Sequence, residues 1–272
     1  MPLHDGYARI TPYELLLPSD DFPERRFPAI EEEAEQRGGD LGDPESFALL
    51  GEVGMSLRAI RGEEEDPALI QQHGALFFHA FHFWREGRPL FLARTGVVRF
   101  LTETGPPQDG WEPRLPAKAG YVQLPQHLVW GPREGDEVPE SVDGLFWAAP
   151  DGENVSLLVA MGVRKDRPGI SVVPLPLLPL GAAAHWASTK VREEGKDFAA
   201  DLPGAELENL CGLRTGAEAV SLAMRIFWYL DTFPGAVGPE TEASDPEEEG
   251  ETGGSLPRPS HLPYRPIRLE EG

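Results

Sequence analysis

Residues 120–180 decide the fold. Short apolar runs recur through this stretch, and Pro, Gly and Asp separate them. The runs are GYVQLP (120–125), HLVW (127–130), GLFWAA (144–149), VSLLVAMGV (155–163) and ISVVPLPLLPL (170–180). Apolar runs of this length between turn-forming residues are typical of strands joined by tight turns. The stretch therefore predicts an antiparallel sheet of about five strands.

Segments on both sides of residues 120–180 have helical patterns. Pro67 follows an acidic residue, and the next residues are apolar around most of the helix circumference until Gly87. The run Val220 to Leu230 is also apolar nearly all round, which indicates a helix packed on several sides. The expected helices cover residues 45–61, 67–86, 95–104, 181–198 and 206–233, the last as one broken helix or two. The expected fold class is α+β, with helices before and after the sheet.

Charge divides the chain into a nearly balanced body and acidic peripheral segments. The net charge is −22, but residues 20–66 hold 15 acids against 5 bases, and residues 236–256 hold 7 acids and no base. Segments rich in acidic residues, Gly and Pro, such as those near both ends of the chain, are expected to bury little surface. The predicted organisation is a loosely ordered acidic arm (1–44), one α+β domain (45–235), a disordered acidic linker (236–255) and a Pro-rich segment (256–272).

Composition also excludes several classes of protein. No basic stripe is present, so direct binding to the nucleic-acid backbone is not expected. Cys211 is the single cysteine, which rules out an intrachain disulfide and favours a buried, inert thiol. The chain lacks a signal-like start and an apolar run long enough to span a membrane, so we expect a cytoplasmic protein.

Histidines in the second predicted helix raise the question of a metal site. His73 and His82 would point to opposite sides of the helix and cannot bind the same ion, whereas His79 and His82 lie on one side of it. Glu86 extends this pair into an H-x-x-H-x-x-x-E stripe that could hold a metal if other helices supplied acids. No other segment offers a matching motif, and core histidines are the commoner case on so aromatic a helix. We therefore expect no metal and no other cofactor. The alternative is a metal ion bound by His79, His82 and Glu86.

Aromatic residues favour a binding surface for a protein or peptide. Phe146 and Trp147 are adjacent on a predicted strand, so their side chains point to opposite faces of the sheet. One face could receive a peptide, and the alternative is that helices of the same chain cover both faces. The candidate binding residues are Tyr121, Trp130, Phe146, Trp147, His79, His82 and Trp84. No nucleophile elbow or phosphate-binding glycine loop is recognisable, so an enzyme is the less expected class.

The order of elements from about residue 68 to 237 resembles the anti-CRISPR proteins that down-regulate a type V-A CRISPR effector nuclease, more closely their relatives in bacterial genomes. The matching features are the aromatic helix ALFFHAFHFWREG (75–87), Leu124 and Pro125 before a strand, the Gly144 to Trp147 motif, and a final aromatic helix ending at Asp231. The resemblance implies an α+β body that recognises the N-terminal segment of a nascent protein and lowers the level of its message.

Three functions follow from these patterns. The first is a non-enzymatic binding or regulatory protein that recognises an N-terminal or nascent peptide and lowers expression of the partner. The second is a metal-dependent enzyme of unfamiliar type that uses His79, His82 and Glu86. The third is a structural or antitoxin-like partner in a complex, bound through the acidic arm.

Overall fold

The structure is a computed structural model of the 272-residue chain. It describes residues 7–16, 22–37, 40–41, 50, 67–104, 111–131, 140–162, 173–174, 178–194, 211–212, 216–242 and 259–270. The helix expected over residues 45–61 lies outside the described residues, apart from the buried, helical Leu50. The side chain of Cys211 is also outside them.

Helices precede, interrupt and follow the strands. They are α1 (Pro12–Leu16), α2 (Phe22–Gln36), α4 (Pro67–Arg85), α5 (Thr95–Glu103), α6 (Leu180–Glu194), α7 (Gly216–Thr232) and the short 3-10 helix η3 (Pro234–Ala236). The expected helices over 67–86, 95–104 and 181–198 are confirmed as α4, α5 and α6. The prediction for residues 206–233 is wrong at its start, because Cys211 and Gly212 form a strand and α7 begins at Gly216.

Seven strands form the main sheet in the order β6-β5-β4-β2-β1-β9, with β7 also paired to β5. Their bounds are β1 (Leu90–Ala93), β2 (Ala119–Gln123), β4 (Val142–Ala148), β5 (Asn154–Met161), β6 (Val173–Pro174), β7 (Leu178–Pro179) and β9 (Arg265–Ile267). A second sheet pairs β3 (Val129–Trp130) with β8 (Cys211–Gly212). The predicted α+β class with a mostly antiparallel sheet is confirmed.

One edge of the main sheet is parallel, which the sequence did not predict. Strand β1 pairs in parallel with both β2 and β9. Parallel neighbours need a crossover connection, and α5 supplies it between β1 and β2. On its other side, β9 is held by hydrogen bonds to residues 236–241, so this part of the C-terminal segment lies inside the hydrogen-bonded layer. The boundaries proposed at residues 44, 235 and 255 stay predictions.

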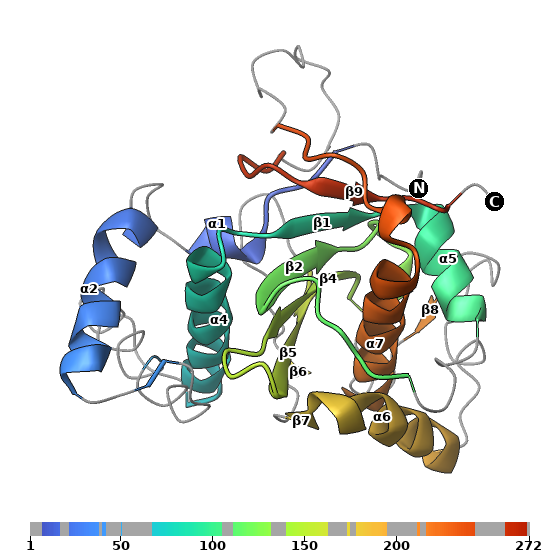
Figure 1. The fold of residues 1–272 in the computed structure, drawn as a ribbon, viewed down its shortest axis with the longest axis horizontal. Coiled ribbons are helices and arrows are strands. Elements are labelled where there is room, and N and C mark those ends of the chain that lie inside the picture. Colours follow the sequence, from blue (N-terminus) through green and yellow to red (C-terminus); the bar gives the residue numbers. More distant parts are fainter. Residues whose placement is uncertain are drawn as a thin grey trace.

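The helices cover the sheet from two sides, with α1, α2 and α4 on one side and α5, α6 and α7 on the other (Figure 1). Alternation along the strands divides the buried residues between these sides. In β4, Phe146 and Ala148 belong to the α4 side, whereas Leu145 and Trp147 belong to the α7 side. The expectation that Phe146 and Trp147 face opposite ways is thus confirmed.

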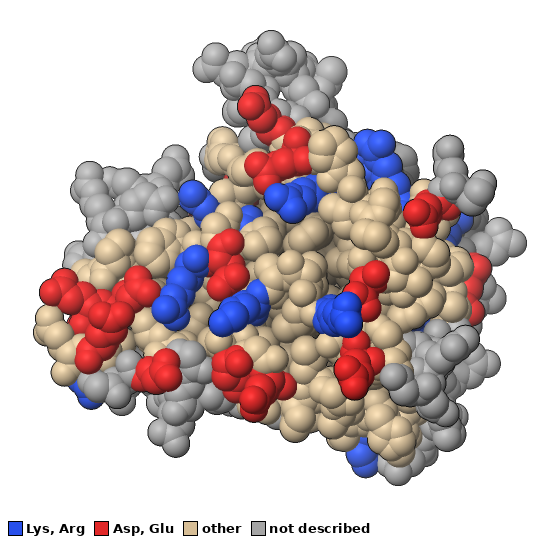
Figure 2. All heavy atoms as spheres, in the orientation of Figure 1, with Lys and Arg blue, Asp and Glu red and all other residues tan. Residues whose placement is uncertain are grey.

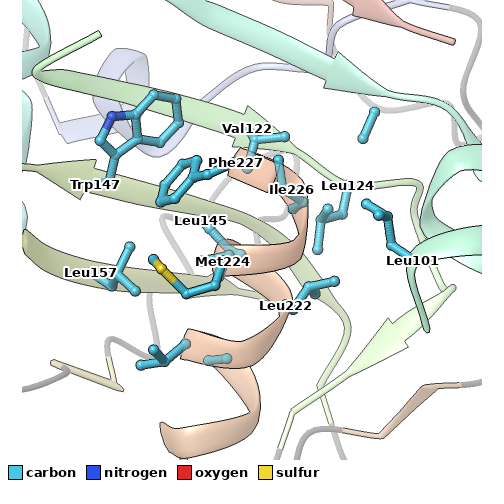
Figure 3. Close-up of a cluster of buried hydrophobic side chains, with 14 of the residues drawn as sticks. Leu101, Val122, Leu124, Leu145, Trp147, Leu157, Leu222, Met224, Ile226 and Phe227 are labelled. Carbon is cyan, nitrogen blue, oxygen red and sulfur yellow. The ribbon is translucent and has the colours of Figure 1, made fainter. Parts of the chain in front are cut away.

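The core on the α7 side includes a large cluster of apolar side chains from the sheet and from α5, α6 and α7. Figure 3 shows Trp147, Leu145 and Leu157 of the sheet beneath Met224 and Phe227 of α7. The Trp147 and Phe227 rings meet edge to face with centroids 5.2 Å apart. Burial of this kind is the main favourable term in folding.

Candidate functional site

Helix α4 presents the two histidines of the site. Pro67 is its first residue, a position that tolerates the missing N–H of proline. Its end is set by Gly87, whose φ of 78° suits a residue without Cβ, and by the Arg88 N–H, which donates to the Phe83 carbonyl at 2.8 Å. The apolar side of α4 packs on the sheet, which places His79 and His82 against the strands or at their margin.

His79 lies in the interior between α4 and β5. Its Nδ1 lies 2.7 Å from the Ala75 carbonyl oxygen, and because a carbonyl only accepts, Nδ1 carries the proton. Burial lowers the pKa of His79 to about 4, although the carbonyls of Ala75 and Ser156 favour the charged form. The ring is therefore neutral at pH 7, and its buried Nε2 has no hydrogen-bond partner among the described residues.

His82 lies one turn further along α4. Its side chain is 3% exposed and touches the ring of Phe78, with centroids 4.6 Å apart. The pKa of His82 is lowered to about 3, chiefly by burial and to a smaller extent by electrostatic repulsion from His79 and Arg85. Its Nε2 is also buried, with no hydrogen-bond partner in the part of the chain that the structure describes. A buried polar atom in this condition is uncommon and costs free energy.

A hollow of about 300 Å³ opens beside His82, between the end of α4 and the beginning of β2. We call it the α4 hollow. Its lining residues are Asp40, His82, Arg85, Glu86, Lys118, Ala119 and Pro150. The volume is at the lower end of the range of about 300 to 1,000 Å³ seen for ligand pockets. On the visible face of the molecule, charges of both signs alternate on the side of α2 and α4, whereas the side of α6 and α7 is less charged (Figure 2).

The two cations of the α4 hollow differ in their surroundings. The Nε of Arg85 is 3.1 Å from Oε1 of Glu31, so α2 holds this guanidinium and neutralises its charge. Lys118 lines the hollow from the start of β2 and forms no ion pair within the described part of the chain. The lining thus includes the carboxylates of Asp40 and Glu86 and the ammonium of Lys118.

The structure brings together only some of the predicted binding residues. The rings of Tyr121 and Phe146 stack at 4.2 Å, and His79 lies 6.5 Å from Phe146. Trp147 is on the other side of the sheet, where its Nε1 donates to the Ala117 carbonyl at 2.9 Å. Tyr121, Phe146 and Trp147 are buried under the chain's own helices, and their role in binding stays a prediction.

Two predicted tryptophans are half-buried. Trp84 packs on α2, with its ring centroid 5.3 Å from that of Phe27. Trp130 lies in the small sheet and stacks on His127, whose backbone has a positive φ of 62°. Neither lines the α4 hollow.

The proposed metal stripe is split. His82 and Glu86 line the α4 hollow, whereas His79 is directed into the interior with its Nδ1 on Ala75. Within the described residues, no three His, Cys, Asp or Glu side chains are grouped so that they could hold a metal ion. The same residues contain no helix long and apolar enough to cross a membrane.

A second buried polar group was not predicted. The Arg9 guanidinium lies 3.6 Å from the Asp143 carboxylate and donates to the Leu124 carbonyl at 2.8 Å. The amide of Gln123 accepts from the Arg9 N–H and donates to the Arg9 carbonyl. Burial lowers the pKa of Arg9, and the Asp143 charge opposes that shift. These contacts fix residues near the N-terminus at the end of β2, and no local sequence pattern indicates them because they join segments 114 residues apart.

Comparisons with known proteins give a weak structural similarity. No protein-family model matches the chain, and no curated protein matches its sequence. Among solved structures, the crystal structure of AcrVA2, a type V-A anti-CRISPR protein, is similar with a TM-score of 0.44 and 12% identity. The similarity covers 94% of this chain and 82% of that chain. At this TM-score it carries no argument about function.

Proposed function

We propose that this chain is a non-enzymatic binding protein that recognises an N-terminal or nascent peptide of a partner protein and lowers expression of that partner. The α4 hollow is the observation that carries the proposal. Its lining combines the imidazole side chain of His82 with charged groups of both signs. Such a hollow offers hydrogen-bond and charge contacts to a small polar group of a ligand.

The two histidines are better suited to binding than to proton transfer. A general acid or base works best with a pKa near the working pH. The pKa values of His79 and His82, at about 4 and about 3, lie far below neutrality because both rings are buried. At pH 7 both rings are neutral and only weakly basic, so neither supplies an efficient proton donor or acceptor.

The regulatory part of the proposal comes from the order of sequence elements described above. That resemblance covers residues 68 to 237, which include α4, β2 and β4. A binding body of this kind would leave the removal of the message to recruited cellular machinery. The function would therefore depend on which peptide the chain captures.

Capture of nascent chains tests this proposal. The tagged protein is isolated from its native host with ribosomes intact and, in parallel, after ribosome dissociation, and both protein and RNA in each sample are identified. We expect one protein to be enriched together with its own message only while ribosomes are intact. Enrichment of a protein partner without its message, with binding lost at high salt, would instead favour a structural or antitoxin-like partner bound through the acidic arm. Such binding depends on exposed charges, which are screened within about 10 Å at 0.1 M salt. Stoichiometric metal in protein purified without chelator would favour the metal enzyme.

A further inference from the structure

Residues 7–11 lie against the end of β2 and the start of β4. All five residues of this YARIT segment are buried, although none of them belongs to a helix or a strand. The segment runs beside the C-terminal segment (Figure 1), where the Ser260 N–H donates to the Ala8 carbonyl at 2.8 Å. A buried stretch outside regular secondary structure depends on particular contacts to satisfy its polar groups.

Gln123 binds the main chain of this segment. Its side-chain oxygen accepts from the Arg9 N–H at 2.7 Å, and its side-chain nitrogen donates to the Arg9 carbonyl at 2.9 Å. One amide thus makes the two hydrogen bonds that a neighbouring strand would make to an extended residue. Main-chain hydrogen bonds of this kind hold an extended peptide whatever its side chains are.

Other groups bind the side chain of Arg9. The guanidinium donates to the Leu124 carbonyl at 2.8 Å and lies 3.6 Å from the Asp143 carboxylate. A guanidinium carries five donors and a fixed charge, so a carbonyl and a carboxylate placed together select arginine over a neutral side chain. Gln123, Leu124 and Asp143 therefore bind one residue by both its main chain and its side chain. We call these three residues the Arg9 site, and none of them lines the α4 hollow.

A β-bulge in β4 supplies the carboxylate of the Arg9 site. The ladder between β4 and β5 shifts register between Val142 and Gly144, so Asp143 is the extra residue. Bulges re-aim a side chain and are common beside functional sites. The next position requires glycine, because a Cβ on Gly144 would come within 2.4 Å of the Tyr121 hydroxyl. The strand thus gives up regular pairing where it supplies this carboxylate.

The buried ion pair of the Arg9 site contributes more to selection than to stability. Burial lowers the pKa of Arg9 in spite of the Asp143 charge, so desolvation outweighs the attraction between the two groups. Buried ion pairs give little net stability, because removing both charges from water costs about as much as their attraction returns. A segment held by such a pair can be replaced at little cost by a peptide of the same chemistry.

We infer that the Arg9 site binds an extended, arginine-containing peptide of another protein, and that residues 7–11 occupy this site as an internal ligand. The net charge of −22 favours a cationic peptide as the competitor. A tethered segment competes at an effective concentration on the order of millimolar, which sets the affinity that a partner peptide must exceed. The site is separate from the α4 hollow, and the inference does not depend on the proposed function.

Peptide binding to full-length variants tests the inference. The arginine probe is YARIT amide with an amino-terminal fluorescein, and the citrulline probe has neutral citrulline in place of the arginine. In Arg9→Met the internal segment lacks its guanidinium and competes less, so the arginine probe should bind this variant roughly tenfold more tightly than the wild type. Fluorescence anisotropy measures the affinities. Equal binding of the two probes to Arg9→Met, or binding of neither, would overturn the inference.

The double variant Arg9→Met with Asp143→Leu is the matched control. It lacks the carboxylate that selects arginine and leaves no buried charge without its partner, so it should fold at least as well as Arg9→Met alone. We expect it to bind the arginine probe no more tightly than the citrulline probe. A preference for arginine that survives in the double variant would place the probe outside the Arg9 site and contradict the assignment.

Hydrogen exchange of the wild type tests the same inference without any substitution. An internal ligand must leave its site while the sheet stays folded, so the amides of residues 7–11 should exchange through local opening. Corrected for intrinsic rates, their exchange should be at least about tenfold faster than that of the β4 amides, as measured by mass spectrometry of proteolytic fragments. Equal protection of the two regions would mean that only global unfolding releases the segment, and the inference would then be wrong.

Discussion

The two faces of the main sheet are built from different chemistry. The residues that the strands direct toward α7, among them Val122, Leu145 and Trp147, are apolar. On the α4 side, buried polar groups are interspersed with aromatic rings, including His79, Gln123 and Ser156. We call these the apolar face and the polar face. Burial of apolar surface stabilises the fold, whereas each buried polar group must find a partner or cost free energy.

The comparison separates stability from recognition. The apolar face needs no particular partner beyond close packing, so its residues are explained by the fold alone. On the polar face, Nε2 of His79 and Nε2 of His82 are buried without a partner among the residues that the structure describes, which packing does not explain. Polar groups kept at such a cost are expected where a protein binds something. The predictions below therefore perturb one face at a time.

Trp147→Ala should have the largest effect, because it removes the biggest side chain of the apolar face. The substitution opens a cavity beside Phe227 and deletes the hydrogen bond to Ala117, so we expect the free energy of unfolding to fall by about 3 to 5 kcal/mol. Urea denaturation measures the change. Trp147→Phe keeps most of the volume and should cost clearly less. Similar losses for both variants would show that the indole hydrogen bond, and not packing, dominates.

Arg9→Met should come next, because it leaves the Asp143 charge buried without its cation. Breaking a buried ion pair by removing one partner costs about 3 to 5 kcal/mol, and the 3.6 Å separation places this pair at about 3. Adding Asp143→Leu should restore much of the loss, since buried pairs are often replaceable by apolar residues. Urea denaturation of the wild type, both single variants and the double variant measures the coupling. Additive losses would mean that the two groups do not act as a pair.

Local patterns predicted the strands of residues 120–180 and most of the helices, but they could not predict contacts between distant segments. The alternation of side chains between the two faces of β4 follows from the two-residue period of a strand. The apolar residues around α7 are likewise recognised from the period of a helix. The pairing of β9 with β1 has no such signal, because it joins positions far apart in sequence.

The same limit applied to the site. His82 and Glu86 were found because they share one side of α4, whereas Lys118 reaches the α4 hollow only through the packing of β2 beside that helix. The burial of Tyr121, Phe146 and Trp147 could not be predicted, because the sequence does not show which helices cover a strand.

Acid should affect the two faces differently. The pKa of His79 is lowered from 6.5 to about 4, so the unfolded chain binds more protons than the folded chain below pH 6.5. The neutral ring of His79 contributes its full stabilisation above pH 6.5, and this stabilisation is lost as the pH falls toward about 4. At pH 5 the loss amounts to about 2 kcal/mol. His79→Gln should reduce the loss of stability between pH 6.5 and 5 by about that amount, measured by urea denaturation at each pH.

Trp147→Phe is the control for this titration, because it changes the apolar face and no titratable group. Its stability should fall with acid as steeply as that of the wild type. If the free energy of unfolding of His79→Gln falls with pH as steeply as that of the wild type, other groups account for the acid sensitivity. The two faces would then not differ in their response to pH.

Ser260→Ala should have the smallest effect. The carboxylate of Glu14 accepts hydrogen bonds from Thr11, from the Ser260 hydroxyl at 2.9 Å and from the His261 N–H at 2.7 Å, which ties residues near the two ends of the chain together beside the polar face. One hydrogen bond to a charged group contributes about 1.5 kcal/mol, and the Ser260 hydroxyl oxygen also accepts from the Leu262 N–H at 3.0 Å, so urea denaturation should show a loss of at least this size. Ser188→Ala removes a hydroxyl that donates only to the Ala184 carbonyl of its own helix, and its stability should change by less than about 0.5 kcal/mol. Equal effects of the two variants would mean that Glu14 is satisfied by its remaining donors, and that the other contacts of the C-terminal segment, such as the Ser260 N–H on the Ala8 carbonyl, are sufficient to hold it.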